Sequence, residues 1–353
     1  MPEEITRGRL KIFLGYAAGV GKTYQMLEEA QQLKRDGYDI VVGYFEPHGR
    51  KDTIAKTVGL EMIPRRKIEY RGSTFEEMDV DAILSRRPEV CVVDEFPHTN
   101  VPGAGREKRW QDVLALLEAG IDVLTTMNVQ HIESLNDQMR QITGVQVRET
   151  LPDWVVREAD DVVMVDLTPR ALLNRLQRGV VYAPDKAIHA RQNFFKEPTL
   201  VALRELALRQ TAHEVEIRQS REQEPSNDRI LIHITADSST AALIRRGRRV
   251  ADYLHAECYA VCVEHPEDRE AREAIERHLN LARHMHIETR VIAGKDTAAA
   301  LVGFARAHRI TQIYLARPQQ RGRLFVGRSL AQQVVRLAEE MQVIVAGNRK
   351  APV

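Results

Sequence analysis

The chain contains 353 residues, of which 43% are hydrophobic and 29% are charged, and its formal net charge is +1. This length exceeds the roughly 250–300 residues at which a single core stops growing, so two domains are expected. No apolar run approaches the roughly 18 residues of a membrane-spanning helix, and the first residues lack the pattern of a signal peptide, so we expect a cytoplasmic protein without a membrane span.

The first predicted strand, over 10–14, leads through a glycine-rich turn into a helix predicted over 23–35. Glycines reach backbone angles that are closed to other residues, so successive N–H groups of such a turn can surround a polyphosphate at the start of the helix. The following lysine can reach the β- and γ-phosphates, and the next threonine can hold Mg²⁺. The predicted ATP-binding residues of this turn are Ala18, Gly19, Val20, Gly21, Lys22 and Thr23.

Tyr16 departs from the complete G-x4-G-K-[ST] pattern, because it occupies the place of the first glycine while Gly15 lies one residue earlier. The Gly-Val-Gly-Lys-Thr core behind a strand is nevertheless typical of a phosphate-binding P-loop, or Walker A motif. The competing interpretation is a glycine-rich turn capped by an ordinary surface lysine.

Residues 10–220 alternate between predicted strands and helices, which indicates an α/β fold with a parallel, P-loop NTPase-like sheet covered by helices on both faces. Several strands are apolar almost throughout, as strands buried on both faces are. The predicted strands lie at 10–14, 40–45, 67–70, 90–94, 123–127 and 162–166, and the predicted helices at 23–35, 81–87, 110–118 and 200–219.

The strand predicted over 90–94 ends in an acidic pair, as a Walker B element does. Asp94 can hold the water shell of Mg²⁺, and Glu95 can polarise an attacking water. Buried strands often end in an acidic residue, so the pattern alone is weak evidence for a Walker B element. The evidence is stronger here because the strand follows a P-loop. We predict Thr23 and Asp94 as magnesium ligands and Glu95 as the hydrolytic base.

Two further loops are predicted to open at the same edge of the sheet as the P-loop. Arg50, after the second strand, can contact phosphate, and Asn128, after the strand over 123–127, can sense a γ-phosphate. The competing interpretation is a solvated charge for Arg50 and a helix N-cap for Asn128.

A polar, proline-containing stretch at 223–228 predicts a linker between domains at 1–222 and 229–353. The second domain has strands predicted at 230–235, 259–264, 286–292, 312–316 and 343–346 with helices between them, which indicates a smaller doubly wound α/β domain. The loop after its first strand leads into a helix that contains arginines, and the loop after its fourth strand itself contains arginines. These arginines form either an anion site or a solvated basic face. Because this basic half lacks aromatic platforms on which bases could stack, we expect no nucleic-acid partner.

Several runs of residues are long and ordered enough to indicate a family. They lie at 19–23, 48–53, 108–112, 125–137, 146–150 and 202–209. Residues 8–220 resemble the N-terminal cytosolic domain of the KdpD potassium-sensor kinase family. Residues 229–348 resemble the universal stress protein module that follows that domain in the family.

The resemblance implies a role in a potassium-responsive two-component system, in which bound ATP modulates signalling to a protein partner. Longer members continue into a membrane bundle and a histidine-kinase core. If this chain is the entire protein, we expect it to resemble the short members and not to autophosphorylate. Some related modules bind cyclic di-AMP, whereas ATP-binding modules use a glycine-rich stretch after the fourth strand. Because residues 317–323 are arginine-rich instead, ATP is not expected at this second site, and the candidates are an anionic dinucleotide or an acidic protein surface.

The leading hypothesis is an ATP-binding regulatory protein, and two other hypotheses are also compatible with the sequence. Glu95 is compatible with an enzyme proper, either a slow ATPase or a kinase. The arginines of the second domain are compatible with a cyclic di-AMP receptor.

Overall fold

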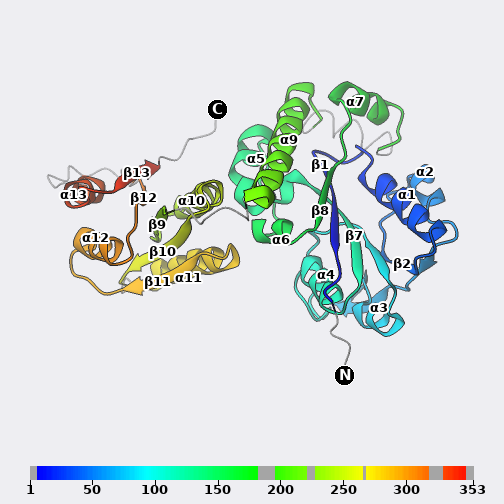
Figure 1. Cartoon of the computed structure of the whole chain (residues 1–353), viewed down its shortest axis with the longest axis horizontal. Helices are drawn as coiled ribbons and strands as arrows, with labels where there is room; N and C mark the ends of the chain where they lie inside the picture. Colours follow the sequence, from blue (N-terminus) through cyan, green and yellow to red (C-terminus); the bar gives the residue numbers. More distant parts are fainter. Residues whose placement is uncertain (1–5, 182–194, 221–226, 265–267, 318–328, 347–353) are drawn as a thin grey trace. The chain divides into compact units, whose positions relative to one another are not determined.

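The computed structural model describes residues 6–181, 195–220, 227–264, 268–317 and 329–346. Its internal contacts divide the chain into two compact units, Met1–Glu216 and Ile217–Val353 (Figure 1). Most of the predicted linker lies outside the described residues. Within the described ranges, the search for a helix long and apolar enough to cross a membrane finds none.

The N-terminal unit contains a six-stranded parallel sheet in the order β3-β2-β6-β7-β1-β8. β7 (Asp122–Asn128) pairs with both β1 (Leu10–Gly15) and β6 (Val90–Val93). A single strand therefore separates the strand before the P-loop from the strand before the acidic pair. The other strands of this sheet are β2 (Ile40–Tyr44), β3 (Glu61–Met62) and β8 (Asp161–Met164).

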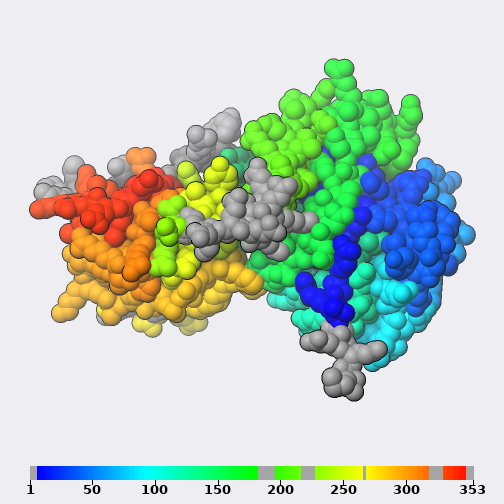
Figure 2. All heavy atoms as spheres, in the orientation of Figure 1, coloured from blue at the N-terminus to red at the C-terminus, as the bar shows by residue number. Residues whose placement is uncertain are grey.

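Strands buried on both faces need a layer of helices on each side. Every residue of β2 and β6 is buried, and so are all but one of β1. β1 pairs with β8 along its other side, and Figure 2 shows residues near the N-terminus, in blue, beside green residues of the same unit. The helices of this unit are α1 (Lys22–Arg35), α2 (Lys51–Ala55), α3 (Val80–Arg86), α4 (Arg109–Glu118), α5 (Asn136–Thr143), α6 (Asp153–Arg157), α7 (Pro169–Gln177) and α9 (Glu197–Ser220), with short 3-10 turns at Val129–His131 and Glu133–Leu135.

The strand predicted over 67–70 does not join the parallel sheet. It belongs to β4 (Arg66–Tyr70), which pairs antiparallel with β5 (Ser73–Glu77) as a separate hairpin. The turn explains the difference, because Arg71 and Gly72 both have positive φ and such a two-residue turn folds the chain directly back on itself. The expectation of another parallel strand here is therefore wrong.

The C-terminal unit is a smaller five-stranded parallel sheet in the order β11-β10-β9-β12-β13. The chain winds outward from β9 in both directions, so the predicted doubly wound α/β fold is confirmed, and β9 and β12 are neighbours at the point where the direction changes. Its elements are β9 (Arg229–His233), α10 (Thr240–Leu254), β10 (Glu257–Val263), α11 (Arg269–His284), β11 (Glu288–Ile292), α12 (Thr297–Ala307), β12 (Gln312–Ala316), α13 (Leu330–Leu337) and β13 (Gln342–Ala346).

Candidate functional site

The turn between β1 and α1 has the backbone that a P-loop requires. Gly19 and Gly21 have φ angles of 88° and 113°, in the left-handed region that side chains disfavour. Gly21 is the N-cap of α1, so the amides of the turn lie at the positive end of a 14-residue helix. An anion placed there would meet N–H groups and a favourable helix dipole.

Tyr16 explains the departure from the complete motif. Its side chain is fully buried, and its hydroxyl donates a hydrogen bond of 2.7 Å to the carbonyl of Leu167. Burial raises the pKa of this phenol to about 12. The first glycine is thus replaced by a side chain that is buried in the core and ties the start of the P-loop to the segment after β8.

Lys22 is a buried cation. Within the described part of the chain, its ammonium donates one hydrogen bond, of 3.3 Å, to the carbonyl of Ala17. Burial lowers the pKa of Lys22 to about 8, although the nearby Asp94 acts in the opposite direction. A phosphate at this position would supply the charged partner that a neutral carbonyl does not.

Thr23 and Asp94 meet across the sheet edge, as the predicted magnesium site requires. The Thr23 hydroxyl lies 3.2 Å from Asp94 Oδ1, and the Thr126 hydroxyl donates a hydrogen bond of 2.5 Å to the same oxygen. Burial raises the pKa of Asp94, and the bond from Thr126 partly offsets this. Hydroxyl and carboxylate oxygens are the donors that Mg²⁺ prefers, so these residues fit that ion.

The sequence alone did not reveal the role of Thr126. It lies on β7, two residues before Asn128, and side chains two apart point to the same face of a strand. That spacing is the signal that could have identified Thr126 as a neighbour of the predicted site.

Glu95 has a partner that sequence reasoning missed. Its backbone is left-handed, with φ of 56°, and its Oε1 lies 3.0 Å from Nε2 of His48. The contact lowers the pKa of Glu95 and raises the pKa of His48. His48 is two residues from Arg50 in the same predicted loop, so the carboxylate predicted as a hydrolytic base is held by the loop that also carries the predicted phosphate ligand.

Asn128 does not act as a side-chain N-cap. It precedes the 3-10 turn at Val129–His131, but its side chain makes no capping hydrogen bond. Its Oδ1 atom is buried and has no hydrogen-bond partner among the described residues. A buried amide oxygen without a partner is costly, so the ligand-binding interpretation fits this residue better than the capping one.

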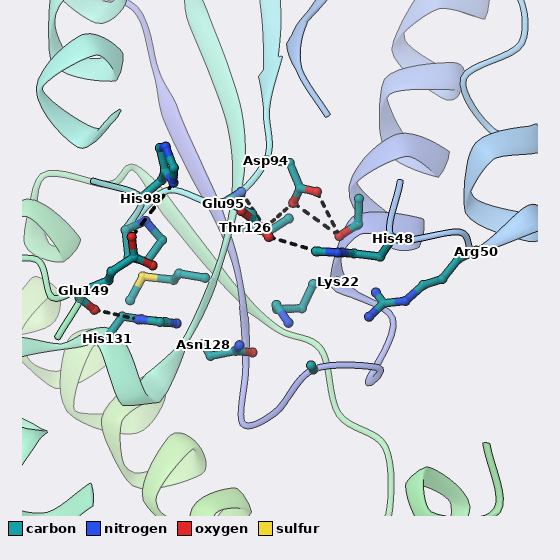
Figure 3. A pocket seen from close by; sticks show the side chains of 14 residues that line it. Lys22, His48, Arg50, Asp94, Glu95, His98, Thr126, Asn128, His131 and Glu149 are labelled. Atoms are coloured by element: carbon teal, nitrogen blue, oxygen red, sulfur yellow. Dashed lines mark hydrogen bonds and ion pairs between the residues drawn. The ribbon is translucent and has the colours of Figure 1, made fainter. Parts of the chain in front are cut away.

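Two cavities adjoin the P-loop. Figure 3 shows Lys22, Arg50 and Asn128 around the first, a polar cavity of about 220 Å³. The second has a volume of about 1030 Å³ and shares Thr23 and Arg50 with the first. The predicted residues that line the first are Ala18, Lys22, Thr23, Arg50, Asp94, Glu95 and Asn128. The second is lined in part by Gly19, Val20, Gly21, Asp166, Leu167, Arg175 and Arg178.

Beneath the acidic pair lies a second buried cation, Arg109, which is fully buried. It donates hydrogen bonds of 3.3 Å to the carbonyl of Asp94 and 3.1 Å to the carboxylate of Glu77, and its guanidinium stacks 3.5 Å from the ring centre of Tyr44. The run at 108–112 contains Arg109, but its two hydrogen-bond partners lie 15 and 32 residues away in the sequence, and no local pattern identifies them.

The predicted anion site of the C-terminal unit is partly outside the described residues. Because β9 and β12 are parallel neighbours, the loops after them leave the same edge of the sheet. Of the arginines in the second loop, Arg317 is described, whereas Arg321, Arg323 and Arg328 are not.

Comparison with known proteins places most of the chain beside sensor proteins of one family. Residues 6–215 match the protein-family model KdpD, described as the osmosensitive K⁺ channel His kinase sensor domain. A putative sensor protein KdpD from Synechocystis sp. is 43% identical over 97% of this chain and 95% of its own length. The sensor protein KdpD of Escherichia coli is 45% identical over 96% of this chain but only 39% of its own length. A solved structure of a universal stress protein in complex with cAMP covers 34% of this chain and 96% of its own, with 19% identity and a TM-score of 0.27.

Proposed function

Because this chain belongs to the KdpD family of sensor proteins, we propose that it binds Mg-ATP at the P-loop and reports the state of that site to a protein partner in a potassium-responsive signalling system. The chain spans most of one relative and about two fifths of another, so the proposal concerns the sensor region alone.

Buried Lys22 is the observation that carries the proposal. A buried ammonium loses hydration, and a bond to one carbonyl restores little of it. A bound triphosphate would restore a full ionic partner in a low-dielectric site. The buried Oδ1 of Asn128, which has no hydrogen-bond partner in the part of the chain that the structure describes, lies in the wall of the same cavity and supports the same conclusion.

The two cavities suggest how the nucleotide lies. The phosphates extend from the amides of Val20 and Gly21, which line the 1030 Å³ cavity, into the 220 Å³ cavity, where Lys22 and Arg50 meet the terminal phosphates. The nucleoside occupies the rest of the 1030 Å³ cavity. Mg²⁺ bound by Thr23 and Asp94 would neutralise phosphate charge. Since Arg50 lines both cavities and His48 in its loop contacts Glu95, a bound phosphate would act directly on the loop at 46–50.

A calorimetric titration with Mg-ATP tests the proposal on the wild type, a Lys22→Ala variant and a Lys67→Ala control. Lys67 is an exposed residue of the β4–β5 hairpin. We expect Lys22→Ala to raise the Kd at least about tenfold and the control to match the wild type. Equal affinity in all three proteins, or no binding to the wild type, would contradict the proposal.

The position of Glu95 in the wall of the 220 Å³ cavity makes hydrolysis a second candidate. A carboxylate kept ionised beside the terminal-phosphate cavity could take a proton from water as the water attacks the γ-phosphate, giving ADP and phosphate. Steady phosphate release that disappears in Glu95→Gln would support a slow ATPase. Tight binding without turnover would leave the regulatory role alone.

For the C-terminal unit we propose an anionic ligand, and cyclic di-AMP is the probe that tests this proposal. The support is the shared edge of the loops after β9 and β12. Titration of cyclic di-AMP into the full Lys22→Ala chain avoids a contribution from the P-loop, and absence of heat at high micromolar ligand would remove this candidate.

A further inference from the structure

The outer side of the P-loop is held by a residue more than 150 positions away in the sequence. Nη1 of Arg175, on α7, lies 3.3 Å from the carbonyl oxygen of Gly19 and 3.4 Å from that of Val20. We infer that Arg175 is a positioning residue, which holds these two carbonyls outward and so turns the amides of Val20 and Gly21 toward a bound phosphate. This inference rests on the proposed ATP site and names a further residue that shapes it.

The argument follows from the geometry of the peptide bond. In a trans peptide the C=O of one residue and the N–H of the next point in opposite directions. The chain has no cis peptide in its described residues, so fixing the carbonyls of Gly19 and Val20 fixes the opposite direction of the next two amides. Two successive amides that point the same way form an anion-binding nest, which needs the positive φ angles seen at Gly19 and Gly21.

α7 is anchored well enough to serve this role. The side chain of Thr168 caps its first turn by accepting a hydrogen bond from the amide of Ala171, and Leu172 and Leu176 are fully buried. Arg175 lies three residues after Leu172, so both project from the same side of the helix toward the P-loop. A Cβ atom added to Gly19 would meet Leu172 at 3.2 Å, which shows how closely this helix approaches the turn.

A second contact comes from the same segment. Leu167, just before α7, accepts the buried hydrogen bond from Tyr16 at the start of the P-loop. The residues around α7 therefore hold the turn at its start, through Tyr16, and further along, at Gly19 and Val20. These contacts are present without a ligand, so Arg175 can hold the P-loop in position before a phosphate binds.

Arg178 provides a matched control. It lies on the same stretch of chain, is exposed, and lines the same large cavity as Arg175. In the described part of the chain its side chain makes no hydrogen bond to the P-loop. An Arg178→Ala variant therefore removes one positive charge from the cavity wall without removing the contacts to Gly19 and Val20.

The first measurement needs no nucleotide. Hydrogen–deuterium exchange of the P-loop peptide is compared in the full-length wild type, Arg175→Ala, Arg175→Lys and Arg178→Ala proteins. We expect exchange to be about tenfold faster in Arg175→Ala, intermediate in Arg175→Lys and unchanged in Arg178→Ala. Equal exchange in the wild type and Arg175→Ala would overturn the inference while leaving the proposed function untouched.

The second measurement is the affinity for Mg-ATP and for magnesium tripolyphosphate, at about 0.05 and 0.5 M salt. We expect Arg175→Ala to raise both Kd values about tenfold at either salt concentration, and Arg178→Ala to have a smaller effect that salt removes. An effect of Arg175→Ala that disappears at high salt would mean simple attraction of the ligand and would overturn the positioning role. A wild type that binds neither ligand would instead contradict the proposed function.

Discussion

The two units place loops at the carboxyl edge of parallel sheets in the same way, yet they differ in the charges buried at that edge. In the N-terminal unit Lys22 and Asp94 are both buried there. In the C-terminal unit the loop after β9 satisfies its polar groups internally, with a hydroxyl contact of 2.8 Å between Thr235 and Thr240 and a hydrogen bond from Ser239 to Asp237. The topology gives both units a place for a ligand at this edge. Among the described residues of the two edges, the buried charges Lys22 and Asp94 in the N-terminal unit give the stronger reason to expect a charged ligand.

One buried titratable group from each unit shows a related contrast. His233, inside β9, has its pKa lowered to about 4 by burial and is therefore neutral near pH 7. Lys22 has a pKa of about 8 and is therefore mostly charged at that pH. A buried group that stays charged near pH 7 thus adjoins the cavity of the N-terminal unit, which is where we place the nucleotide.

The largest expected effect concerns the buried cation Arg109. It tests how much a buried charge pair stabilises the N-terminal unit. Replacing Arg109 with Ala leaves the buried carboxylate of Glu77 without its cation, although His98 still contacts it at 3.1 Å. We expect a loss of about 3–5 kcal/mol in the free energy of unfolding, the usual cost of removing one partner of a buried pair. Trp110 and Trp154 both lie in the N-terminal unit, so tryptophan fluorescence during urea unfolding reports on this unit alone.

Arg66→Ala is the matched control, because Arg66 pairs with Asp81 at 3.3 Å on the surface of the same unit. An exposed pair contributes little, so this variant should lose less than about 1 kcal/mol. Similar losses in the two variants would show that Arg109 acts as an ordinary surface arginine, and the contrast between the units would lose its main support.

A second prediction concerns the pH dependence of nucleotide binding. Since the pKa of Lys22 is about 8 in the free protein, more alkaline solutions remove the proton that a bound phosphate needs. We expect the Kd for Mg-ATP to be nearly constant below pH 8 and to rise by up to about tenfold per pH unit above it, with proton uptake on binding. Calorimetry in buffers of different ionisation enthalpy measures that uptake.

Lys22→Arg is the control, because a guanidinium stays charged throughout this range. Its affinity, although weaker, should not change between pH 7 and 9. A wild type that shows the same flat profile would mean that Lys22 does not titrate in the binding step.

The sequence predicted those residues and elements that short local motifs determine. Lys22, Thr23, Asp94 and Glu95 each belong to a short pattern tied to a strand end, and their elements were predicted to within a few residues. The helix over 200–219 was likewise found within α9, because its period is visible in one stretch of chain.

The rest depends on partners far apart in the sequence. The hydroxyl of Tyr16 reaches Leu167, and Arg175 reaches Gly19, across more than 150 residues. Sequence periodicity gives the face of a strand but not which strands are neighbours, so the bond from Thr126 to Asp94 became evident only once β7 was seen between β1 and β6. Long-range contacts that fix the site thus required the structure.

The smallest expected effect concerns the contact between His48 and Glu95 at the edge of the first cavity. Its stabilisation requires both charges. The pKa of His48 is raised above 6.5, so its contribution is complete below pH 6.5 and is lost as the pH rises through the raised value. The pKa of Glu95 is lowered below 4.5, so its contribution is complete above pH 4.5 and is lost as the pH falls through the lowered value. The coupling between them should therefore be largest between these two reference values.

A double-mutant cycle of His48→Ala and Glu95→Gln, followed by tryptophan fluorescence during urea unfolding, measures this coupling. The side chains are 45% and 38% exposed, so solvent screening limits the coupling to about 0.5 kcal/mol near pH 5.5, and it should approach zero near pH 9. Arg50 and Glu46 also face His48, with opposite effects on its charge, and both are unchanged throughout the cycle. A coupling that is the same at both pH values would mean that the contact is a neutral hydrogen bond, and Glu95 would then owe its ionisation to other groups such as Arg109.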